Sequence, residues 1–220
     1  MARQPFRPRD KDTPFEIGSA VIEEVPELAA LVGRIAINWA GVEVQLSLVL
    51  SSMLGVDNSA AVAVFLSLRN HRAQRDALRA AAAVSLSDEE REIFDLILSS
   101  HEELNKQRND VVHCVWGRCA SAPDGILWSS QQNHALMLVR DYHMSDTGQL
   151  THDSRLSNMT KDLFVVRYTD LEALNSSVTT LERTIGSFQA YLRYKGTTAG
   201  DWCYEQLQAF RSRHEGPSDG

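Results

Sequence analysis

Apolar residues recur every three or four positions over long stretches of the chain, which is the pattern of amphipathic helices. The first such stripe runs from Leu28 to Met53; it is preceded by Pro26 and followed by Gly55. Proline is favoured in the first turn of a helix, and glycine is favoured just after the last turn. The pattern therefore predicts a helix over residues 26–54, on the order of 40 Å long at about 1.5 Å per residue.

Two further helices are predicted before the middle of the chain. Asp57-Asn58 can cap a helix, and the alanine-rich stretch 60–84 that follows is a strong helix former, so we expect one continuous second helix there. Ser87 and Glu90 stand three residues apart in SDEE, which is the spacing of a capping box. A third helix is expected to begin at this box.

A segment of short strand-like runs follows the third helix. Asp124-Gly125 is a good hairpin-turn signal between two such runs. Residues 134–144 and 162–168 are expected to be further strands, separated by a polar stretch. The sequence therefore predicts a small β insert on a helical frame.

The last long helix is expected to begin at Thr169, because TDLE places Glu172 three residues on, as in another capping box. Gly196 is placed to end this helix. A short helix over 201–212 is expected to follow.

Together these elements predict a mainly α fold. We expect a helical bundle with a small antiparallel β insert at about 117–168, before the last long helix. Residues 1–20 are rich in proline and charge and are expected to form a flexible arm, residues 21–210 one helical domain, and residues 211–220 a frayed tail. The apolar stripes are wide, which also permits an interface with a second copy of the chain.

Composition narrows the class of protein. A hydrophobic content of 43% supports a packed core, and a formal net charge of -7 provides no general basic field for nucleic acid, so any RNA binding requires a local patch. Three cysteines without paired spacing predict neither a disulfide framework nor a zinc site, and no cofactor is expected. The N-terminus has no apolar signal core, and we expect no membrane span. A cytoplasmic protein is the expectation.

The stretch RNDVVH, residues 108–113, carries the most specific chemistry. Asn109 and His113 are four residues apart and share one helical face. Arg108 interrupts a row of apolar positions that should face the core, and a guanidinium is rarely buried without a partner. It therefore faces either a cleft or an acid. Glu43 is a candidate acid, because it lies beside the apolar stripe of its own helix, one turn after Trp39.

These residue types are sufficient for metal-free RNA cleavage. A histidine can give or take a proton near neutral pH, and an arginine can stabilise the charge that grows on a phosphoryl group. The 2′-hydroxyl of the RNA would attack the adjacent phosphate. His113 would transfer a proton, Arg108 would hold the phosphate, and Asn109 would position either His113 or the phosphate. The spacing alone does not separate this role from a structural ion pair or a helix-end histidine.

The context of the motif resembles the HEPN superfamily (higher eukaryotes and prokaryotes nucleotide-binding domains). The arginine and histidine of its Rx4–6H signature fall on Arg108 and His113, and the polar residue that usually follows the arginine matches Asn109. Several bacterial members also have a W-x3-E on an early helix, which matches Trp39 and Glu43.

Two further features extend this resemblance over most of residues 26–195. Trp116 follows the motif histidine, and FVVRYTDLEAL matches an aromatic-containing strand that runs into the last helix. The chain departs from one common form of the signature at Val115, where that form has a tyrosine.

This resemblance implies a HEPN-like four- to five-helix bundle that forms a homodimer. Active members are metal-independent endoribonucleases of toxin–antitoxin and phage-defence systems, with RNA as substrate and a separate antitoxin or regulator protein as a possible partner. Arg108, Asn109 and His113 would then be the catalytic residues, supported by Glu43 and Trp39. Other members do not cleave, so the alternative is a non-catalytic nucleotide- or RNA-binding or protein-assembly module.

Two features outside the motif could contact RNA. Four arginines close to one helical face could follow an RNA backbone, or they could form a solvated face; they are Arg69, Arg72, Arg75 and Arg79. Trp116 could stack on a base or cover an edge of the core. His71 is expected at the surface, and His101 at a simple polar position of its helix.

Overall fold

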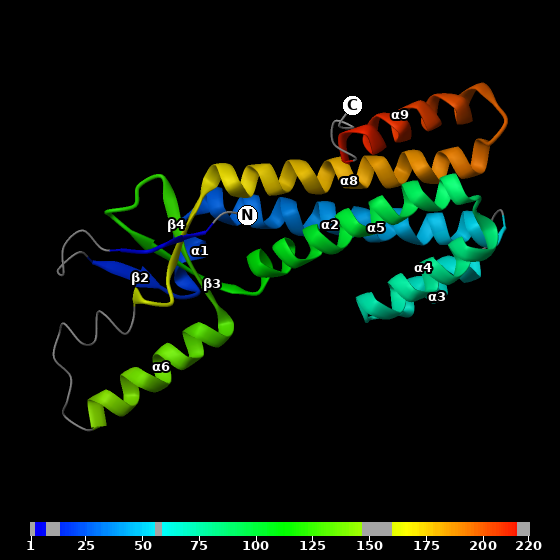
Figure 1. Ribbon diagram of the computed structural model, residues 1–220. Helices are drawn as coiled ribbons and strands as arrows, with labels where there is room; N and C mark the ends of the chain where they lie inside the picture. The colour runs from blue at the N-terminus through cyan, green and yellow to red at the C-terminus, as the bar shows by residue number, and fades with distance from the viewer. Residues whose placement is uncertain (1–2, 8–13, 56–58, 147–159, 215–220) are drawn as a thin grey trace, which may run out of the picture. The chain divides into compact units, whose positions relative to one another are not determined.

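The computed structural model describes residues 3–7, 14–55, 59–146 and 160–214. Within these ranges the chain is mainly helical and carries one small antiparallel sheet (Figure 1), which confirms the predicted fold class. The chain divides into two compact units. Unit 1 contains residues 1–36 and 106–175, and unit 2 contains residues 37–105 and 176–220.

Three long helices supply most of the helical residues: α2 (Pro26–Leu54), α5 (Asp88–Val112) and α8 (Tyr168–Tyr194). The bounds of α2 agree with the prediction, and Gly55 follows it with a φ of +115°, a left-handed conformation that favours glycine. The capping box at the start of α5 is confirmed by hydrogen bonds from Ser87 N to Glu90 Oε2 (2.8 Å) and from Glu90 N to Ser87 Oγ (3.4 Å).

The predicted second helix is two helices, α3 (Ser59–Ser67) and α4 (His71–Ser85), so the prediction of one continuous helix was wrong. Asn70 separates them, since its backbone is extended and its side chain accepts a hydrogen bond from Arg72 N at 2.9 Å. Alanine favours helix on both sides of this point, but a good N-cap residue starts a new helix there.

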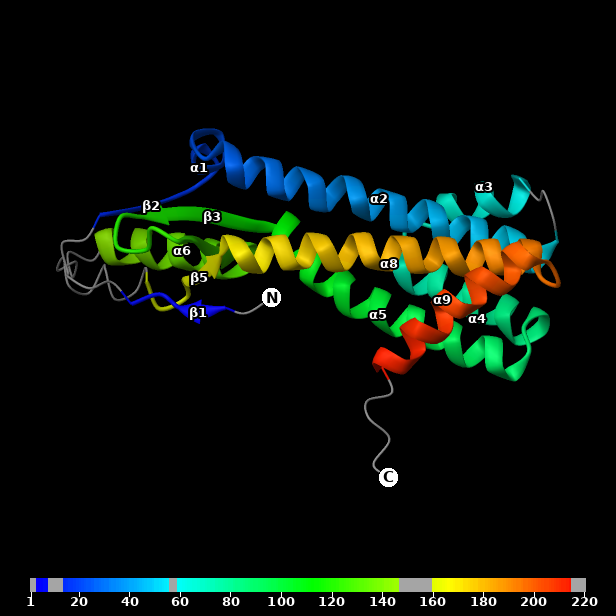
Figure 2. The same ribbon diagram turned by 90° about the horizontal axis from the view of Figure 1, so that it is seen from above.

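The core of unit 2 is built from aromatic and aliphatic side chains of its helices. Phe94 and Phe188 stack with ring centroids 5.2 Å apart, and both are buried. The last helix, α9 (Thr198–His214), lies beside α8 in both views (Figures 1 and 2). It contains residues 201–212, for which a short helix was predicted. The rings of Tyr191 and Tyr204, 5.2 Å apart, join α8 and α9.

A buried carboxylate ties the start of α5 to the end of α8. Glu90 accepts hydrogen bonds from Lys195 Nζ (2.7 Å) and Tyr191 Oη (2.9 Å). Burial alone would raise the pKa of Glu90, but the hydrogen bonds from Lys195, Ser87 and Tyr191 outweigh it and lower this pKa to about 2.

The sheet belongs to unit 1 and has the strand order β1-β5-β4-β3-β2, with every neighbouring pair antiparallel. β3 (Cys114–Cys119) and β4 (Gly125–Ser130) form the predicted hairpin, with Trp116 opposite Trp128. β5 (Phe164–Arg167) is the predicted strand before the last long helix.

The described part of the expected flexible arm is instead paired into this sheet. β1 (Gln4–Pro5) pairs with β5, and β2 (Phe15–Ile17) pairs with β3. The physical reason is a small apolar cluster on the sheet, in which Phe6 is buried against Cys119 and Leu127. Pairing and burial therefore order these residues.

The predicted strand over 134–144 is a helix, α6 (Gln131–Asp146), and that prediction was wrong. Ser130 Oγ accepts a hydrogen bond from Asn133 N (3.1 Å) at the start of the helix. Met137 is then buried, whereas Val139 remains 51% exposed. Figures 1 and 2 show α6 on one side of the sheet.

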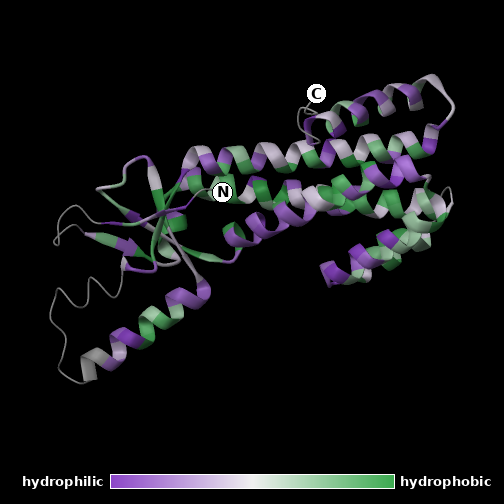
Figure 3. Ribbon diagram, in the orientation of Figure 1, coloured by the Kyte–Doolittle hydropathy of each residue, from purple (hydrophilic) through white to green (hydrophobic). Residues whose placement is uncertain are grey.

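One helix among the described residues, α2, is long and apolar enough to cross a membrane by length and composition, which the sequence-based expectation missed. Hydrophobic residues recur along its whole length (Figure 3). Core helices of soluble proteins pass the same test, and the stripe from Leu28 to Met53 is buried by the protein itself. Its hydropathy is therefore weak evidence for a membrane span.

Candidate functional site

The RNDVVH motif lies at a junction between a helix and a strand in unit 1. α5 ends at Val112, and His113 N closes its last turn with a hydrogen bond to Asn109 O (2.9 Å). β3 begins at the next residue, Cys114. The motif thus occupies the end of α5.

One nitrogen of the Arg108 guanidinium donates a hydrogen bond, and another has no hydrogen-bond partner among the described residues. Its Nη1 donates to Asn109 Oδ1 at 2.9 Å, which fixes the plane of the group. Its Nε is buried and has no hydrogen-bond partner among the described residues. A buried donor without a partner costs about 1–3 kcal/mol, so an oxygen atom of a ligand or water that reached this nitrogen would be stabilised.

His113 is exposed, in contrast to the half-buried Arg108 and Asn109. Asn109 and His113 share one face of the last helical turn, as their spacing requires. The helix end therefore offers a guanidinium of fixed orientation and, five residues further on, an imidazole that solvent or a ligand can reach. Such a pair can hold an anion and exchange a proton with it.

The end of α5 is held in place by a clamp that the sequence reasoning missed. Arg3 forms an ion pair with the carboxylate of Asp110, and its guanidinium stacks 3.9 Å from the centroid of the Trp128 ring. Trp128 Nε1 donates to Asp110 O at 2.7 Å. Asp110 therefore joins α5 to β4 and to the residue just before β1, and it holds the motif residues on either side of it. No local pattern links Arg3 to Asp110, because they are 107 positions apart.

Cys114 follows the motif but is poorly suited to be a nucleophile. Its Sγ donates to Val111 O at 3.2 Å. Burial raises the pKa of the Cys114 thiol to about 12, so the reactive thiolate is scarce at neutral pH. Cys114 is therefore better explained as a half-buried packing residue.

Trp39 and Glu43 lie together in unit 2. Trp39 is buried, and its Nε1 donates to Glu43 Oε1 at 3.1 Å. Arg108 belongs to unit 1, so the pairing of Glu43 with Arg108 stays a prediction. The bond from Trp39 gives Glu43 a partner on its own helix.

Two histidines of unit 2 form a cluster that the sequence did not predict. His101 is only 8% exposed and stacks on Trp39 with ring centroids 4.9 Å apart. His71 lies 6.4 Å from His101, and its Nδ1 is buried without a partner among the described residues. Burial, and then the nearby His71 and Arg75, lower the pKa of His101 to about 4. The expectation of a simple polar position for His101 was wrong, because its ring is buried against Trp39 of α2, whereas His71, expected at the surface, is half-buried.

The arginine-rich face of α4 is largely neutralised by acidic residues of unit 2. The ion pairs join Arg75 to Glu102 (2.6 Å), Arg79 to Asp95 (3.9 Å) and Arg72 to Asp76 (3.9 Å). Arg69 precedes α4 and is exposed. These pairs favour the interpretation of a solvated face of mixed charge, and RNA contact there stays a prediction.

Trp116 lies in β3 and is only 5% exposed. A base needs an open aromatic face to stack on, so this burial favours the interpretation of Trp116 as a core residue. Val115, where the common form of the signature has a tyrosine, pairs with Ser129 across the hairpin.

Among the described residues, no three histidine, cysteine, aspartate or glutamate side chains gather in a way that could hold a metal ion. Comparisons of the chain with protein-family models, curated proteins and solved structures found no match. A function for the chain must therefore be inferred from its own residues and their geometry.

Proposed function

We propose that the chain is a metal-independent endoribonuclease of the HEPN type, with His113 as the general acid or base and Arg108 as the phosphate-stabilising group. One observation carries the proposal. The exposed imidazole of His113 shares a helical face with Asn109, and Asn109 orients the guanidinium of Arg108, whose Nε is buried without a described partner. This is the pair of groups that a phosphoryl transfer without metal requires.

In the proposed reaction, the 2′-oxygen of the RNA forms a bond to the adjacent phosphorus while the bond from phosphorus to the 5′-oxygen breaks. The products are a 2′,3′-cyclic phosphate and a 5′-hydroxyl. One proton leaves the 2′-hydroxyl and one reaches the departing 5′-oxygen. His113 carries out one of these transfers, and Arg108 stabilises the crowded phosphorane with its guanidinium.

A second copy of the chain would supply the second histidine. Each chain brings one Arg108–His113 pair, so a homodimer with both motifs at one cleft has a base and an acid for the two proton transfers. We further propose that the protein acts in the cytoplasm as a toxin or phage-defence effector, with a separate antitoxin or regulator protein to restrain it.

The direct experiment incubates the purified full chain with long RNA in the presence of a metal chelator. The wild type is expected to cut RNA. His113→Ala should lower the rate by about 10²–10⁴-fold, because a general acid or base is lost. Arg108→Ala should lower it by about 10²–10³-fold, because a charged donor to the transition state is lost. His143→Ala removes another exposed histidine of unit 1 and is the matched control, expected to cut at the wild-type rate.

Thermal unfolding of each variant shows whether the loss is catalytic or structural. If the wild type cuts no RNA, or if His113→Ala cuts as fast as the wild type, the nuclease proposal is wrong. Tight RNA or nucleotide binding without cleavage would favour the alternative of a non-catalytic binding or assembly module.

A further inference from the structure

The RNDVVH motif contains an acidic residue, Asp110, at a place where a negative charge is unfavourable. Asp110 lies in the last turn of α5, three residues before His113. The C-terminal end of a helix carries a partial negative charge, so a carboxylate there is destabilised and a cation is favoured. The last turn of α5 has no basic side chain of its own. A compensating cation therefore has to come from outside the helix.

Arg3 supplies this cation from the residue just before β1. Its guanidinium forms an ion pair with the Asp110 carboxylate and stacks 3.9 Å from the centroid of the Trp128 ring. β1 is held in the sheet by its pairing with β5 and by the burial of Phe6 in the apolar cluster. All of these residues belong to unit 1. A strand of the sheet thus brings Arg3 to the motif.

Asp110 also lies close to a group that the proposed reaction uses. Residues three apart are neighbours on the surface of a helix, with Cβ atoms about 5–6 Å apart, so Asp110 neighbours His113. The helical turn extends to His113, because His113 N donates to Asn109 O at 2.9 Å. The side chains of Arg3 and Asp110 are 28% and 41% exposed, so solvent reaches the pair. A phosphate that contacts His113 would therefore be influenced by the charge of Asp110.

Without its partner, this carboxylate would repel a phosphate. Two like charges about 7 Å apart weaken binding by about 3- to 50-fold, over the range from the dielectric constant of water to the effective value near a protein surface. The positive charge of Arg3 lies next to the carboxylate and cancels most of this repulsion. Arg3 is therefore placed to change the affinity of the motif for an anion.

We propose that Arg3 supports RNA binding at the motif by acting through Asp110. It neutralises the acid inside the motif, so that the phosphate of an RNA can approach Arg108 and His113. This inference rests on the proposed function, because it takes RNA as the ligand of the motif. It adds Arg3, a residue 105 positions from Arg108 in the sequence, to the residues that control substrate affinity.

The test measures binding of a fluorescent RNA oligonucleotide to the full chain by anisotropy. The oligonucleotide carries 2′-O-methyl groups, so it has no 2′-hydroxyl to attack the phosphate and stays intact. Arg3→Met should weaken binding by about tenfold, because Asp110 is left without its cation. Asp110→Asn should bind at least as tightly as the wild type, because the repelling charge is gone.

The double variant separates this role from that of a purely structural clamp. Arg3→Met combined with Asp110→Asn should bind within about threefold of the wild type, because no charge is left to compensate. A structural clamp predicts the opposite pattern, in which loss of either partner weakens binding and the double variant is not rescued. Arg3→Lys keeps the charge and should also bind within about threefold of the wild type.

Salt provides a second readout. Repulsion between exposed charges is screened by salt, so the ratio of the dissociation constants of Arg3→Met and the wild type should shrink from about 0.05 M to about 0.5 M salt. A change of conformation at the end of α5 would leave this ratio unchanged. Thermal unfolding of each variant shows that it is folded under the conditions of the binding measurement.

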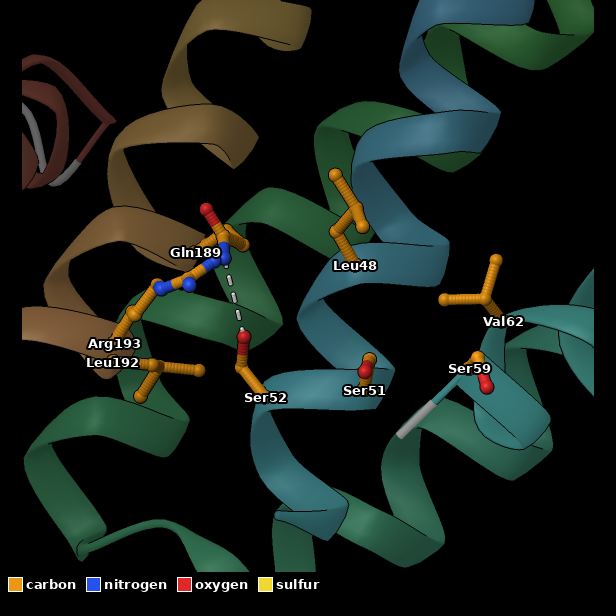
Figure 4. A pocket seen from close by; sticks show the side chains of 8 residues that line it. All are labelled: Leu48, Ser51, Ser52, Ser59, Val62, Gln189, Leu192 and Arg193. Carbon is orange, nitrogen blue, oxygen red and sulfur yellow. Dashed lines mark hydrogen bonds between the residues drawn. The ribbon is translucent and has the colours of Figure 1, made fainter. Parts of the chain in front are cut away.

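Two arginine variants are matched controls for the loss of one positive charge. Arg7→Met removes an exposed arginine of the same N-terminal segment. Arg193→Met removes an arginine from a pocket of unit 2, which Ser52 and Gln189 also line (Figure 4) and which contains none of the motif residues. Each should change binding by less than about twofold. A loss equal to that of Arg3→Met would show that total charge controls binding, and it would overturn the proposal.

The outcomes also distinguish this proposal from the nuclease proposal. If the wild type cuts RNA but Arg3→Met binds as tightly as the wild type, or if the double variant binds as weakly as Arg3→Met, the role of Arg3 is wrong and the nuclease proposal stands. If the wild type binds RNA without cutting it and the variants follow the expected pattern, the role of Arg3 stands and the nuclease proposal is wrong. If the wild type binds no RNA, both are wrong.

Discussion

At the scale of single residues, Asp110 shows how the motif is held and why the sequence could not reveal it. The position of Arg108 and His113 at a helix end was predictable, because the apolar period of α5 stops there. The partners of Asp110 were not predictable, because Arg3 and Trp128 come from distant parts of the chain. A backbone carbonyl at a helix end, such as Asp110 O, needs a hydrogen-bond donor from outside the helix. Nothing in the local sequence pattern indicates that the indole of Trp128 is this donor.

Trp128→Phe tests this clamp. The variant keeps an aromatic ring below Arg3 and removes the hydrogen bond from Nε1 to Asp110 O. The free energy of unfolding should fall by about 1 kcal/mol, measured by urea denaturation, because a part-buried carbonyl loses its donor. Trp202→Phe, at a position 60% exposed in α9, is the control and should change it by less than about 0.5 kcal/mol. Equal effects of the two variants would contradict the clamp.

His101 predicts a pH dependence of stability. Its pKa is about 4 in the folded chain and about 6.5 in an unfolded one. Between these values the unfolded state binds the proton more tightly, so the contribution is complete above about pH 6.5 and is lost as the pH falls toward 4. The loss should approach about 3 kcal/mol, since one pKa unit corresponds to about 1.4 kcal/mol.

Urea denaturation of the wild type and His101→Gln from pH 7 to pH 4 measures this contribution. The variant cannot titrate at this position and should lose stability less steeply over that range, whereas His143→Gln, at an exposed position, should follow the wild type. Parallel curves for the wild type and His101→Gln would show that the buried imidazole does not control the pH dependence.

At the scale of elements, the long helices were predictable and the short ones were not. The stripe and the end signals of α2 are consistent with each other, so its bounds were correct. For α6, a short apolar run fits a strand as well as a helix, and the decision rests on Ser130 as a cap and on the burial of Met137. The spacing of apolar residues along the sequence shows neither the cap at Ser130 nor the burial of Met137.

Asn70 tests the break between α3 and α4. Asn70→Ala removes the side-chain acceptor for Arg72 N and should lower the free energy of unfolding by about 1 kcal/mol. Asn70→Asp keeps an acceptor oxygen and should retain most of the stability. Chemical denaturation measures both variants. If alanine is neutral or stabilising here, the break is not fixed by this cap.

Glu90 predicts an acid-dependent loss of the contacts that join α5 to α8. Its pKa is lowered from 4.5 to about 2 in the folded chain, so its contribution is present above about pH 4.5 and is lost as the pH falls toward 2. Glu90→Gln should lower stability at pH 7 and flatten the acid limb of the unfolding curve. The measurement is the thermal unfolding midpoint from pH 7 to pH 2. An acid limb as steep as that of the wild type would contradict the role of Glu90.

At the scale of the whole molecule, the division into two units was not predicted. The boundary between residues 36 and 37 falls inside α2, where the apolar stripe continues from Ile35 to Trp39 without a break. A periodic pattern reports that a helix is amphipathic and does not report which residues cover it. The N-terminal strands were missed for a similar reason, since two- and three-residue strands are too short to show alternation.

The proposed homodimer makes a prediction at this scale. Sedimentation equilibrium should give twice the chain mass of 24.6 kDa for the wild type. An excess of inactive His113→Ala chains is mixed with the wild type, and the subunits are allowed to exchange. The rate of RNA cleavage should then fall below the rate expected from dilution of the wild type alone, because mixed dimers lack one histidine. A monomeric mass, or a rate that follows dilution alone, would contradict a shared cleft.

In the proposed reaction, RNA itself supplies the nucleophile and His113 carries out one of the two proton transfers without metal. The most direct test is the cleavage rate of an RNA oligonucleotide in chelator, compared with the same oligonucleotide carrying a single 2′-deoxy nucleotide at the cut site. We predict rapid cleavage of the first, with a 2′,3′-cyclic phosphate product, and no cleavage of the second at that site. Cleavage of both at equal rates, or of neither, would contradict it.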